Sequence, residues 1–197
     1  MKHYVIARAG ASPDWSVIPA LEIDAQLWRA PVDIAAQAQL AWDDERLHVR
    51  LTAREARIRA EHRGPLGMPC EDSCLEFFFS PAPGDPRYFN LEYNPNACLY
   101  LGFGDGKNLT RLLPERDWFG AVAERTDDGW RVTYAVPFDF VRLFVPGFAP
   151  VSGGAIRANC YKCGDLTAAE HYLAWNPCTS ETPNFHRPGD FGLMTFE

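Results

Sequence analysis

Residues 71–103 read EDSCLEFFFSPAPGDPRYFNLEYNPNACLYLGF, and this stretch decides the fold. Leu, Phe and Tyr recur at every second position in 74–79 and again in 88–94. Because successive side chains of a strand point to opposite faces, this period predicts two β-strands. The turn 81–86, PAPGDP, is too rich in Pro and Gly for a helix and favours an antiparallel hairpin. A third strand is predicted over 99–103.

The same alternation separates a core face from a polar face. The residues expected in the core are Leu75, Phe77, Phe79, Phe89, Leu91 and Tyr93. Glu76, Asn90 and Glu92 then share the other face of the sheet. The hairpin therefore predicts two carboxylates and a carboxamide close together.

The remainder of the chain continues in short strand-like segments separated by turns. Strands are predicted over 4–7, 37–42, 47–53, 119–125, 130–136, 155–163, 172–175 and 191–196. The only helix candidate, 137–144, starts at a Pro and is closed by Pro146-Gly147. About ten strands against one short helix predict an all-β, two-sheet antiparallel β-sandwich of the jelly-roll or immunoglobulin-like kind.

The chain has 197 residues and a formal net charge of −7. This length suits one all-β unit, so residues 1–197 are predicted to form a single domain. Nucleic acids and anionic membranes are bound through basic patches, and the acidic charge argues against both as partners. Neutral ligands such as saccharides stay open, and the oligomeric state is not predicted.

The N-terminal segment and the cysteines bear on location. The apolar run 4–7 is too short for a secretory signal, which predicts a cytoplasmic protein. Without export, the six cysteines are expected to be reduced. Cys160 and Cys163 form a C-x-x-C on a predicted strand, where such neighbours face opposite sides, whereas zinc and redox motifs use turns or helix starts. No metal site is therefore predicted.

Further polar side chains extend the face of the carboxylates. Arg157, Asn159 and Tyr161 alternate with apolar residues on strand 155–163. His48 and Arg50 join them if strand 47–53 belongs to the same sheet. Such a face is often simply solvated. Grouped Arg, Glu and Asn side chains, however, donate and accept in pairs, which suits vicinal sugar hydroxyls.

Four runs of the sequence resemble carbohydrate-binding module family nine, a β-sandwich family known from domains attached to xylanases. They are the D-S-C-x-E-F-F run, the F-N-x-E-x-N run, the opening WSVIPALEID and the closing HYLAWNP…PNFHRPGDFG. The resemblance covers nearly the whole chain. It implies non-catalytic binding of a saccharide or a polysaccharide end in bacterial carbohydrate catabolism. The ligand would lie on an open sheet face beside aromatic loop residues.

The resemblance also implies a site, with departures from the family pattern. The family's polar contacts correspond best to Glu76, Asn90 and Tyr161, of which only Glu76 keeps its residue type. Cys70 and Phe185 fall near the two places where the xylanase module has clamp tryptophans. We therefore expect a differently specialised branch. Its expected ligand-binding residues are Arg50, Glu76, Asn90, Glu92, Asn159, Tyr161, His171, Trp175, Phe185 and His186.

Each aromatic or imidazole side chain has an alternative role. Trp175 is either a platform for a sugar ring or a core residue. Phe185 lies in a Pro-rich loop, which favours ligand contact. His171 and His186 are more typical of hydrogen-bonded residues than of metal ligands.

Two other functions compete with sugar binding. A glycosidase needs two carboxyl groups about 5 to 10 Å apart across a sugar, which Glu76 and Glu92 could provide. Neighbouring Arg50 and Arg157 would lower the pKa of both carboxyls, so binding is favoured over catalysis. A haem-binding electron-transfer domain would instead use Met68 with a histidine, either His171 or His186.

No cofactor is predicted, and structural calcium, known in the resembling family, is left open. A calcium loop needs several clustered oxygen ligands, whereas the turn after the third strand offers only Asp105. Asp105, Asp127 and Asp128 are interpreted as turn formers.

Overall fold

The computed structural model describes residues 1–82 and 84–197, so Pro83 of the predicted turn 81–86 lies outside the described residues. The chain is almost entirely β. Its strands are β1 (His3–Arg8), β2 (Leu21–Glu22), β3 (Ala25–Gln26), β4 (Ala35–Trp42), β5 (Arg46–Arg54), β6 (Cys74–Ser80), β7 (Tyr88–Tyr93), β8 (Leu99–Gly104), β9 (Thr110–Arg111), β10 (Val122–Arg125), β11 (Gly129–Pro137), β12 (Ala155–Gly164), β13 (His171–Ala174) and β14 (Gly192–Phe196). The helix α1 covers Phe138–Arg142, inside the predicted segment, and 3₁₀ turns cover Pro69–Glu71 (η1) and Pro188–Asp190 (η2).

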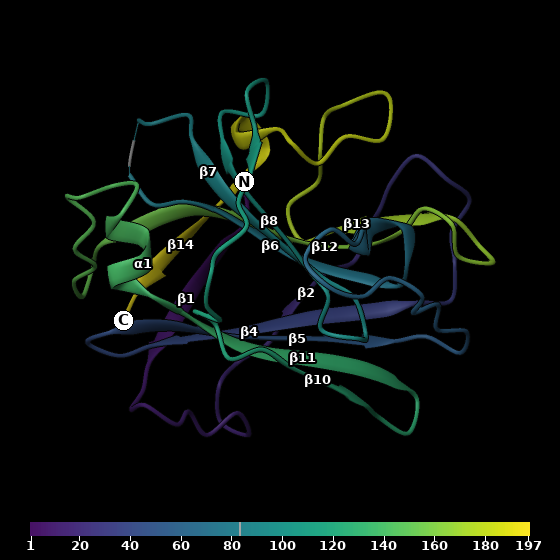
Figure 1. Cartoon of the computed structure of the whole chain (residues 1–197), viewed down its shortest axis with the longest axis horizontal. Helices are drawn as coiled ribbons and strands as arrows, with labels where there is room; N and C mark the ends of the chain where they lie inside the picture. Colours follow the sequence, from purple (N-terminus) through teal and green to yellow (C-terminus); the bar gives the residue numbers. More distant parts are fainter. Residues whose placement is uncertain (83) are drawn as a thin grey trace.

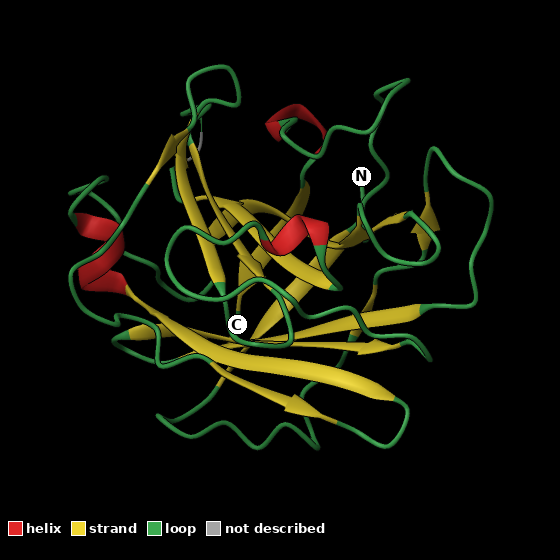
Figure 2. Ribbon diagram, turned by 45° about the vertical axis from the view of Figure 1, so that its right-hand side comes forward, coloured by secondary structure: helices red, strands yellow, loops and turns green. Residues whose placement is uncertain are grey.

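The strands form one hydrogen-bonded path that curls on itself, in the order β10-β11-β5-β4-β1-β14-β12-β6-β7-β8-β9 (Figures 1 and 2). Strand β1 joins two halves of this path. The β6 half runs from β14 to β9 and includes β13 and β3; the β5 half contains β4, β5, β11, β10 and β2. In Figure 1 the strands of the β5 half lie side by side as a layer beneath the β6 half.

The two pairings of β1 are parallel, whereas the predicted antiparallel hairpins are present elsewhere. His3–Ile6 pair with β14, and Ala7 and Arg8 pair with β4. Local alternation identifies a strand but carries no information about which distant strand it joins. The parallel pairings of the first strand therefore could not be predicted from the periodicity.

The main core lies between the two halves. It takes Val49 from β5, Trp130 from β11 and Phe77 from β6, among others. The six predicted core residues, Leu75, Phe77, Phe79, Phe89, Leu91 and Tyr93, are all buried, which confirms the period-two interpretation. Burial of one such side chain contributes about 1.5–3 kcal/mol. A slip of one residue would place Glu76 in this core, so the register is strongly fixed.

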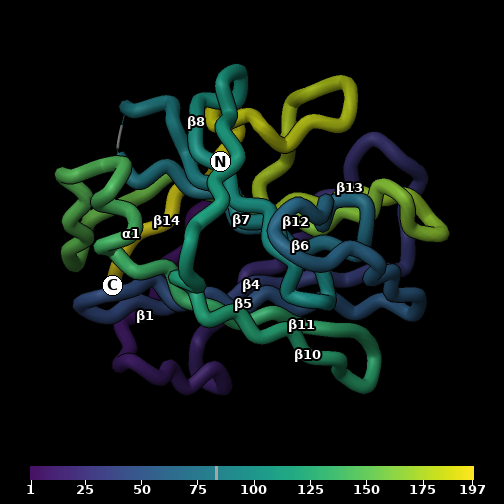
Figure 3. The backbone as a smooth tube through the Cα atoms, viewed as in Figure 1, coloured from purple at the N-terminus to yellow at the C-terminus, as the bar shows by residue number. Residues whose placement is uncertain are grey.

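The outer face of the β6 half is not open, in contrast to the prediction. Every residue of β6 and β7 is buried. A second cluster covers this face, in which Phe78, Tyr88 and Tyr161 pack with Phe185 and Phe191. The last two come from the segment after β13, drawn in yellow and curving over the β12 side of the sheet in Figure 3. Its phenylalanines, Phe185 and Phe191, are removed from solvent by packing on this outer face.

Other differences from prediction are local. Strands β2, β3 and β9 have two residues each and lie in segments expected to be irregular, because two residues cannot show an alternation. Strand β10 covers only the end of the predicted 119–125. Within the described residues, the helices are too short and too polar to cross a membrane.

Candidate functional site

A cavity of about 370 Å³ lies on the outer face of the β6 half. Strands β6, β7, β8 and β12 contribute to its floor, and segments 68–70 and 183–186 to its walls. Its lining residues are Trp28, Met68, Cys70, Glu76, Glu92, Tyr100, Cys163, Asp165, Tyr172, Pro183, Asn184, Phe185 and His186.

A row of four cross-strand partners crosses this face. Tyr161 on β12 pairs with Glu76 on β6, Glu76 with Glu92 on β7, and Glu92 with Tyr100 on β8. Directly opposed residues of antiparallel strands point to the same side of the sheet. The two carboxylates therefore lie next to each other on one face, as the alternation predicts.

Burial controls the protonation of this pair. Glu76 and Glu92 are only 3% and 6% exposed. Desolvation, followed by repulsion from Glu92, raises the pKa of Glu76 well above its ordinary value. Desolvation also raises the pKa of Glu92 to about 7. Near neutral pH the pair keeps a proton, so it offers a hydrogen-bond donor as well as acceptors.

Each carboxyl group has a buried donor beside it. The Cys163 thiol donates to Glu76 Oε1 at 3.0 Å, and Asn90 Nδ2 donates to Glu92 Oε1 at 2.7 Å. Gly102, the cross-strand partner of Asn90, gives that amide its space, since a Cβ there would lie 2.1 Å from Asn90 Oδ1. Asn90 therefore positions Glu92 and is not itself part of the cavity lining.

A thiol–carboxylate cluster adjoins the carboxylate pair. Cys74 and Cys163 are cross-strand partners, and the ligand atoms of Cys74, Glu76 and Cys163 all lie within 4.8 Å of one another. This is a set that could hold a thiophilic metal ion. Burial raises the pKa of Cys74 to about 12, and a hydrogen bond with Cys74, followed by burial, raises that of Cys163. All six cysteines are free thiols.

Aromatic rings form the wall of the cavity opposite to β8. Phe185 stacks on Tyr161 with centroids 4.1 Å apart and an interplanar angle of 15°. Trp28 lies 5.4 Å from Phe185 and 5.5 Å from Tyr172. Trp28 has a positive φ of 58°, and its Nε1 donates to the carbonyl of Ser180 at 2.6 Å. The wall is thus a packed group of rings with a fixed orientation.

His186 completes the wall next to Phe185. Its ring stacks on Phe78 with centroids 5.3 Å apart, and its Nδ1 lies 2.8 Å from the Tyr88 hydroxyl. Burial lowers the pKa of His186, so the imidazole is neutral near pH 7. It therefore adds no positive charge to the cavity.

The ten residues expected to bind ligand are placed unequally. Four of them line the cavity, namely Glu76, Glu92, Phe185 and His186. Asn90 and Tyr161 support these from directly beneath. The other four, Arg50, Asn159, His171 and Trp175, lie elsewhere.

The expected pairing of arginines with the carboxylates is wrong. Arg50 belongs to the β5 half, where its guanidinium packs 4.7 Å from the centroid of Trp15. Arg157 donates to the carbonyls of Phe191 and Gly192. The alternation of apolar and polar residues predicts that these side chains point outward. It does not predict which sheet they belong to or which residues they contact. The expected lowering of the carboxyl pKa values is accordingly replaced by an increase.

Asn159 has a structural role. Its Nδ2 donates to the carbonyl of Asn176 at 2.8 Å, and its Oδ1 accepts from the Asn176 N–H at 2.9 Å. This reciprocal pair fixes the start of the segment that carries Phe185, so Asn159 acts on the cavity only through the backbone.

Trp175 and His171 point away from the cavity. Trp175 is a residue of the main core, packed so closely that a Cβ on Gly192 would lie 2.4 Å from its ring. His171 is buried beside Lys162, whose Nζ lies 2.8 Å from its Nε2. Strand β13 has only four residues, and so short a pattern does not show from sequence which face of the sheet each side chain occupies.

Several lining residues were not singled out from the sequence as ligand contacts. Trp28 lies in an N-terminal segment for which no strand was predicted, and Tyr100 lies on the predicted third strand. Asp165 and Tyr172 flank the β12–β13 turn. Tyr100 could have been found from its register with Glu92, whereas Trp28 and Asp165 reach the cavity only through tertiary packing.

The haem and calcium alternatives can be placed in the structure. Met68 and His186 both line the cavity, whereas His171 does not. The Met68 sulfur accepts from Arg111 Nη1 at 3.5 Å. Asp105 accepts the backbone N–H groups of Lys107 and Asn108, as a turn former does.

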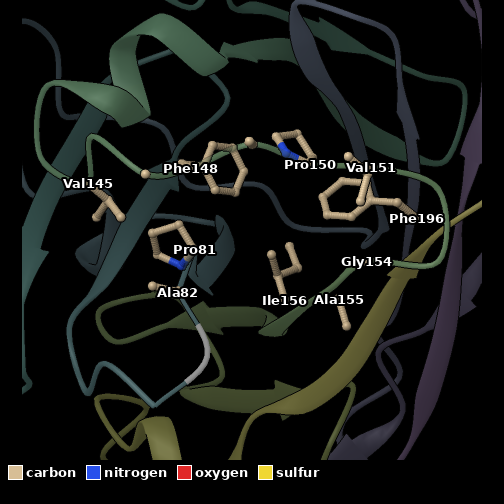
Figure 4. Close-up of a pocket in the computed structure, with 12 residues that line it drawn as sticks. Pro81, Ala82, Val145, Phe148, Pro150, Val151, Gly154, Ala155, Ile156 and Phe196 are labelled. Atoms are coloured by element: carbon tan, nitrogen blue, oxygen red, sulfur yellow. The ribbon is translucent and has the colours of Figure 1, made fainter.

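A second cavity, of about 340 Å³, lies between the segment after α1 and strands β12 and β14 (Figure 4). Its residues, such as Phe148, Pro150 and Ile156, are apolar, and its described lining contains no charged side chain. It lacks groups that recognise hydroxyls. The first cavity is therefore the candidate site.

A curled all-β sheet with a carboxylate floor and a stacked aromatic wall defines a ligand-binding β-domain whose polar groups suit hydroxyl-bearing ligands. Residues 14–196 match the sequence profile of carbohydrate-binding family 9, and the chain belongs to that family. No protein with a curated description matches the chain.

Solved structures agree with this assignment. A candidate carbohydrate-binding protein from Bacteroides uniformis is 26% identical, with a TM-score of 0.85 and coverage of 100% of this chain and 99% of that one. A family 9 carbohydrate-binding module from Caldicellulosiruptor kristjanssonii in complex with cellotriose is 14% identical, with a TM-score of 0.73 and coverage of 100% and 94%. The same identity and TM-score are found for a glucose complex, with coverage of 100% and 96%.

Proposed function

We propose that the cavity over Glu76 and Glu92 binds a saccharide without catalysing its hydrolysis. The observation that carries this proposal is the carboxyl pair lying directly beside the stacked ring of Phe185. Membership of carbohydrate-binding family 9 supports it, as do the glucose and cellotriose complexes of the similar modules. The fold proposed for this function is a two-sheet jelly-roll sandwich with the cavity on one outer face.

The chemistry of the cavity matches that of a sugar ring. Glu92 accepts from vicinal hydroxyls, and the proton retained by the carboxyl pair supplies a donor in return. Half-buried Trp28 offers apolar ring surface to the C–H face of the sugar, and Phe185, which is 7% exposed and stacked on Tyr161, adds its uncovered part to the same wall. The volume of about 370 Å³ lies within the range of roughly 300–1,000 Å³ typical of small-molecule sites. A short saccharide, or the end of a longer one, fits this description.

Geometry favours binding over hydrolysis. The pKa of Glu92, raised to about 7, would suit a general acid. The prediction that neighbouring arginines lower the carboxyl pKa values therefore no longer argues against catalysis. However, Glu76 and Glu92 are direct cross-strand partners, which places their Cβ atoms about 4.5–5.5 Å apart on one surface. The two carboxyls of a glycosidase flank the scissile bond. A pair on a single surface contacts one side of the sugar and leaves the other side without a catalytic group.

Calorimetric titration with glucose and with cellotriose tests the proposal. Glu92→Gln removes an acceptor with little change in shape and should weaken binding by about tenfold. Phe185→Leu should weaken it as well, since the flat surface is lost. Glu22→Gln, at the exposed residue of β2 in the other half, is the matched control and should bind like the parent. Binding that is unchanged in both cavity variants would exclude this site.

A further inference from the structure

The cavity contains an excess of negative charge. Three of its lining residues carry carboxyl groups, Glu76, Glu92 and Asp165, and the described lining contains neither Lys nor Arg. Asp165 Oδ1 is buried, and the described residues give it no hydrogen-bond partner. The polar surface offered to a ligand is thus rich in acceptors, and no cationic side chain shares the described lining with them.

Cations near the cavity are engaged elsewhere. Arg111 packs on the Tyr100 ring at 4.5 Å and donates to the carbonyls of Pro65 and Gly67. Arg29 is paired with Glu170 at 2.7 Å. The hydrogen bonds of these guanidinium groups go to the Met68 sulfur, to backbone carbonyls and to Glu170, and none goes to a cavity carboxyl.

On the opposite face of the sheet, Lys162 lies 3.3 Å from Glu55 Oε1 and also contacts His171. Its ammonium group is therefore neutralised on the core side of β12. Lys162 and Arg111 each act on one cavity carboxyl at a distance, lowering the pKa of Glu76 and of Glu92 respectively, but in both cases this is the smallest of the causes. Neither cation donates a hydrogen bond to these carboxyls, and the neutral His186 adds no charge.

The aromatic wall adds a second preference for positive charge. The faces of Trp28 and Phe185 carry partial negative charge, so cations are attracted to them. Desolvation strengthens this attraction, and the carboxyl pair below the rings is buried. Carboxylates beneath aromatic faces form a site for an organic ammonium group.

We propose that this cavity selects a saccharide bearing a protonated amine, an amino sugar of the glucosamine class, over the corresponding neutral sugar. The inference rests on the proposed saccharide-binding function and specifies its ligand. An ammonium group brings one positive charge and three N–H donors to a surface that supplies mainly acceptors. A neutral sugar fills the same space and leaves the carboxylates without a counter-ion.

The protonation of the empty site is consistent with this preference. Burial raises the pKa values of Glu76 and Glu92, with repulsion from Glu92 added at Glu76 and from Asp165 at Glu92, so the cavity takes up a proton to reduce its charge. A bound ammonium group would replace that proton and interact with an ionised carboxylate through a charge-assisted hydrogen bond, the stronger kind. Acetylation of the amine removes the charge and should remove the preference.

Titration of the purified protein with three probes tests the inference: glucosamine, glucose and N-acetylglucosamine. The experiment is done at neutral pH and low salt, with a chelator present so that metal at the Cys74–Glu76–Cys163 cluster cannot contribute. Glucosamine should bind about tenfold or more tightly than glucose, and N-acetylglucosamine should not share the gain. The advantage should shrink as salt is added. Equal affinities for glucose and glucosamine would overturn the inference and leave saccharide binding intact, whereas absence of binding by all three would remove both.

A charge-neutral variant provides the second readout. Asp165→Asn keeps the shape of the side chain and should lower the glucosamine-to-glucose affinity ratio several-fold. Asp127→Asn, in the exposed turn between β10 and β11, should leave that ratio at the parental value. Melting curves of both variants report whether the fold is retained. An unchanged ratio in folded Asp165→Asn would count against the ammonium site.

Discussion

The Lys162 ammonium group lies 3.3 Å from the Glu55 carboxylate, and both side chains are buried between the two halves of the sheet. Lys162 comes from β12, and Glu55 directly follows β5. Trp130 Nε1 and Ser73 Oγ also donate to Glu55, at 2.7 and 2.9 Å. Lys162 has only donors, so His171 Nε2 accepts from it and the Nδ1–H donates to Ala169. A satisfied polar network therefore joins the halves inside the core.

Removing one member of this network should be costly. Glu55→Gln leaves the Lys162 charge buried without its partner, and the free energy of unfolding should fall by about 3–5 kcal/mol. Urea denaturation measures this change. Glu124→Gln, which breaks the exposed pair with Arg131, is the control and should cost less than about 1 kcal/mol. Similar midpoints for both variants would show that the buried pair contributes no more than a surface pair.

The carboxyl pair should make stability depend on pH. The pKa of Glu92 is raised from 4.5 to about 7 in the folded protein, so the folded state holds a proton that the unfolded state has released. The contribution of Glu92 is therefore full below about pH 4.5 and is lost as the pH rises towards 7, at up to about 1.4 kcal/mol per pH unit.

Other groups titrate in the same range, and two buried histidines, His171 and His186, have the opposite sign. Burial lowers the pKa of His171 to about 4, which makes the folded state more stable as the pH rises through the unfolded value of 6.5. The informative quantity is therefore the difference between the parent and Glu92→Gln, measured by denaturation across this range. The variant should lack the part of the decline due to Glu92, and parallel curves would contradict the assigned pKa.

Trp175 and Phe185 should separate stability from binding. Trp175 lies in the main core, so Trp175→Ala should cost about 3–5 kcal/mol of unfolding free energy and leave the affinity of the folded fraction nearly unchanged. Phe185→Leu should lose affinity with a smaller loss of stability. Thermal melting and ligand titration on the same samples decide the matter. Loss of affinity in folded Trp175→Ala would show that Trp175 contributes to ligand binding.

Gly102 offers a test of the positioning of Glu92. Gly102→Ala puts a Cβ 2.1 Å from Asn90 Oδ1 and should displace the amide that donates to Glu92. Saccharide affinity should fall although Gly102 does not line the cavity. Gly147→Ala, where a Cβ meets no atom within 4 Å, is the matched control. Parental affinity in Gly102→Ala would mean that Asn90 does not position Glu92.

Thiol reactivity should report on the cavity. Cys70 is half-buried in the wall, Cys163 is buried in the floor of the cavity, and Cys74 is buried outside the lining. Burial raises the pKa of Cys70, so we expect slow labelling of the native protein by a disulfide reagent, first at Cys70, and protection by bound saccharide. The denatured, unreduced protein should titrate all six thiols. Fast native labelling at Cys163 would show that the cavity floor opens.

The sequence predicted the parts of the site that depend on alternation. Leu75 and Phe77 identify a buried face, and the adjacency of Glu76 and Glu92 follows once the hairpin is paired. Alternation does not state which sheet a strand joins, and for this reason Arg50 was assigned to the wrong half. It also does not show that a later segment covers the polar face, so the predicted open surface is instead a cavity.

The wall of the site could be predicted only in part. Phe185 was found because an aromatic residue in a Pro-rich loop is difficult to bury in the main core, and His186 was found through the family resemblance. Trp28 reaches Phe185 from a segment more than a hundred residues earlier in the sequence, through packing that no local pattern encodes. The family resemblance located the site without supplying these contacts.

The parallel pairing of β1 has a consequence for synthesis. His3 pairs with Leu193 and Ala7 with Ala41, so one six-residue strand is needed by neighbours from both ends of the sequence. During synthesis on a ribosome, β1 can pair with β4 early. It can pair with β14 only after nearly all of the described chain has emerged. The nascent chain thus exposes an unpaired edge of β1 from the synthesis of β4 until the synthesis of β14, which closes that edge.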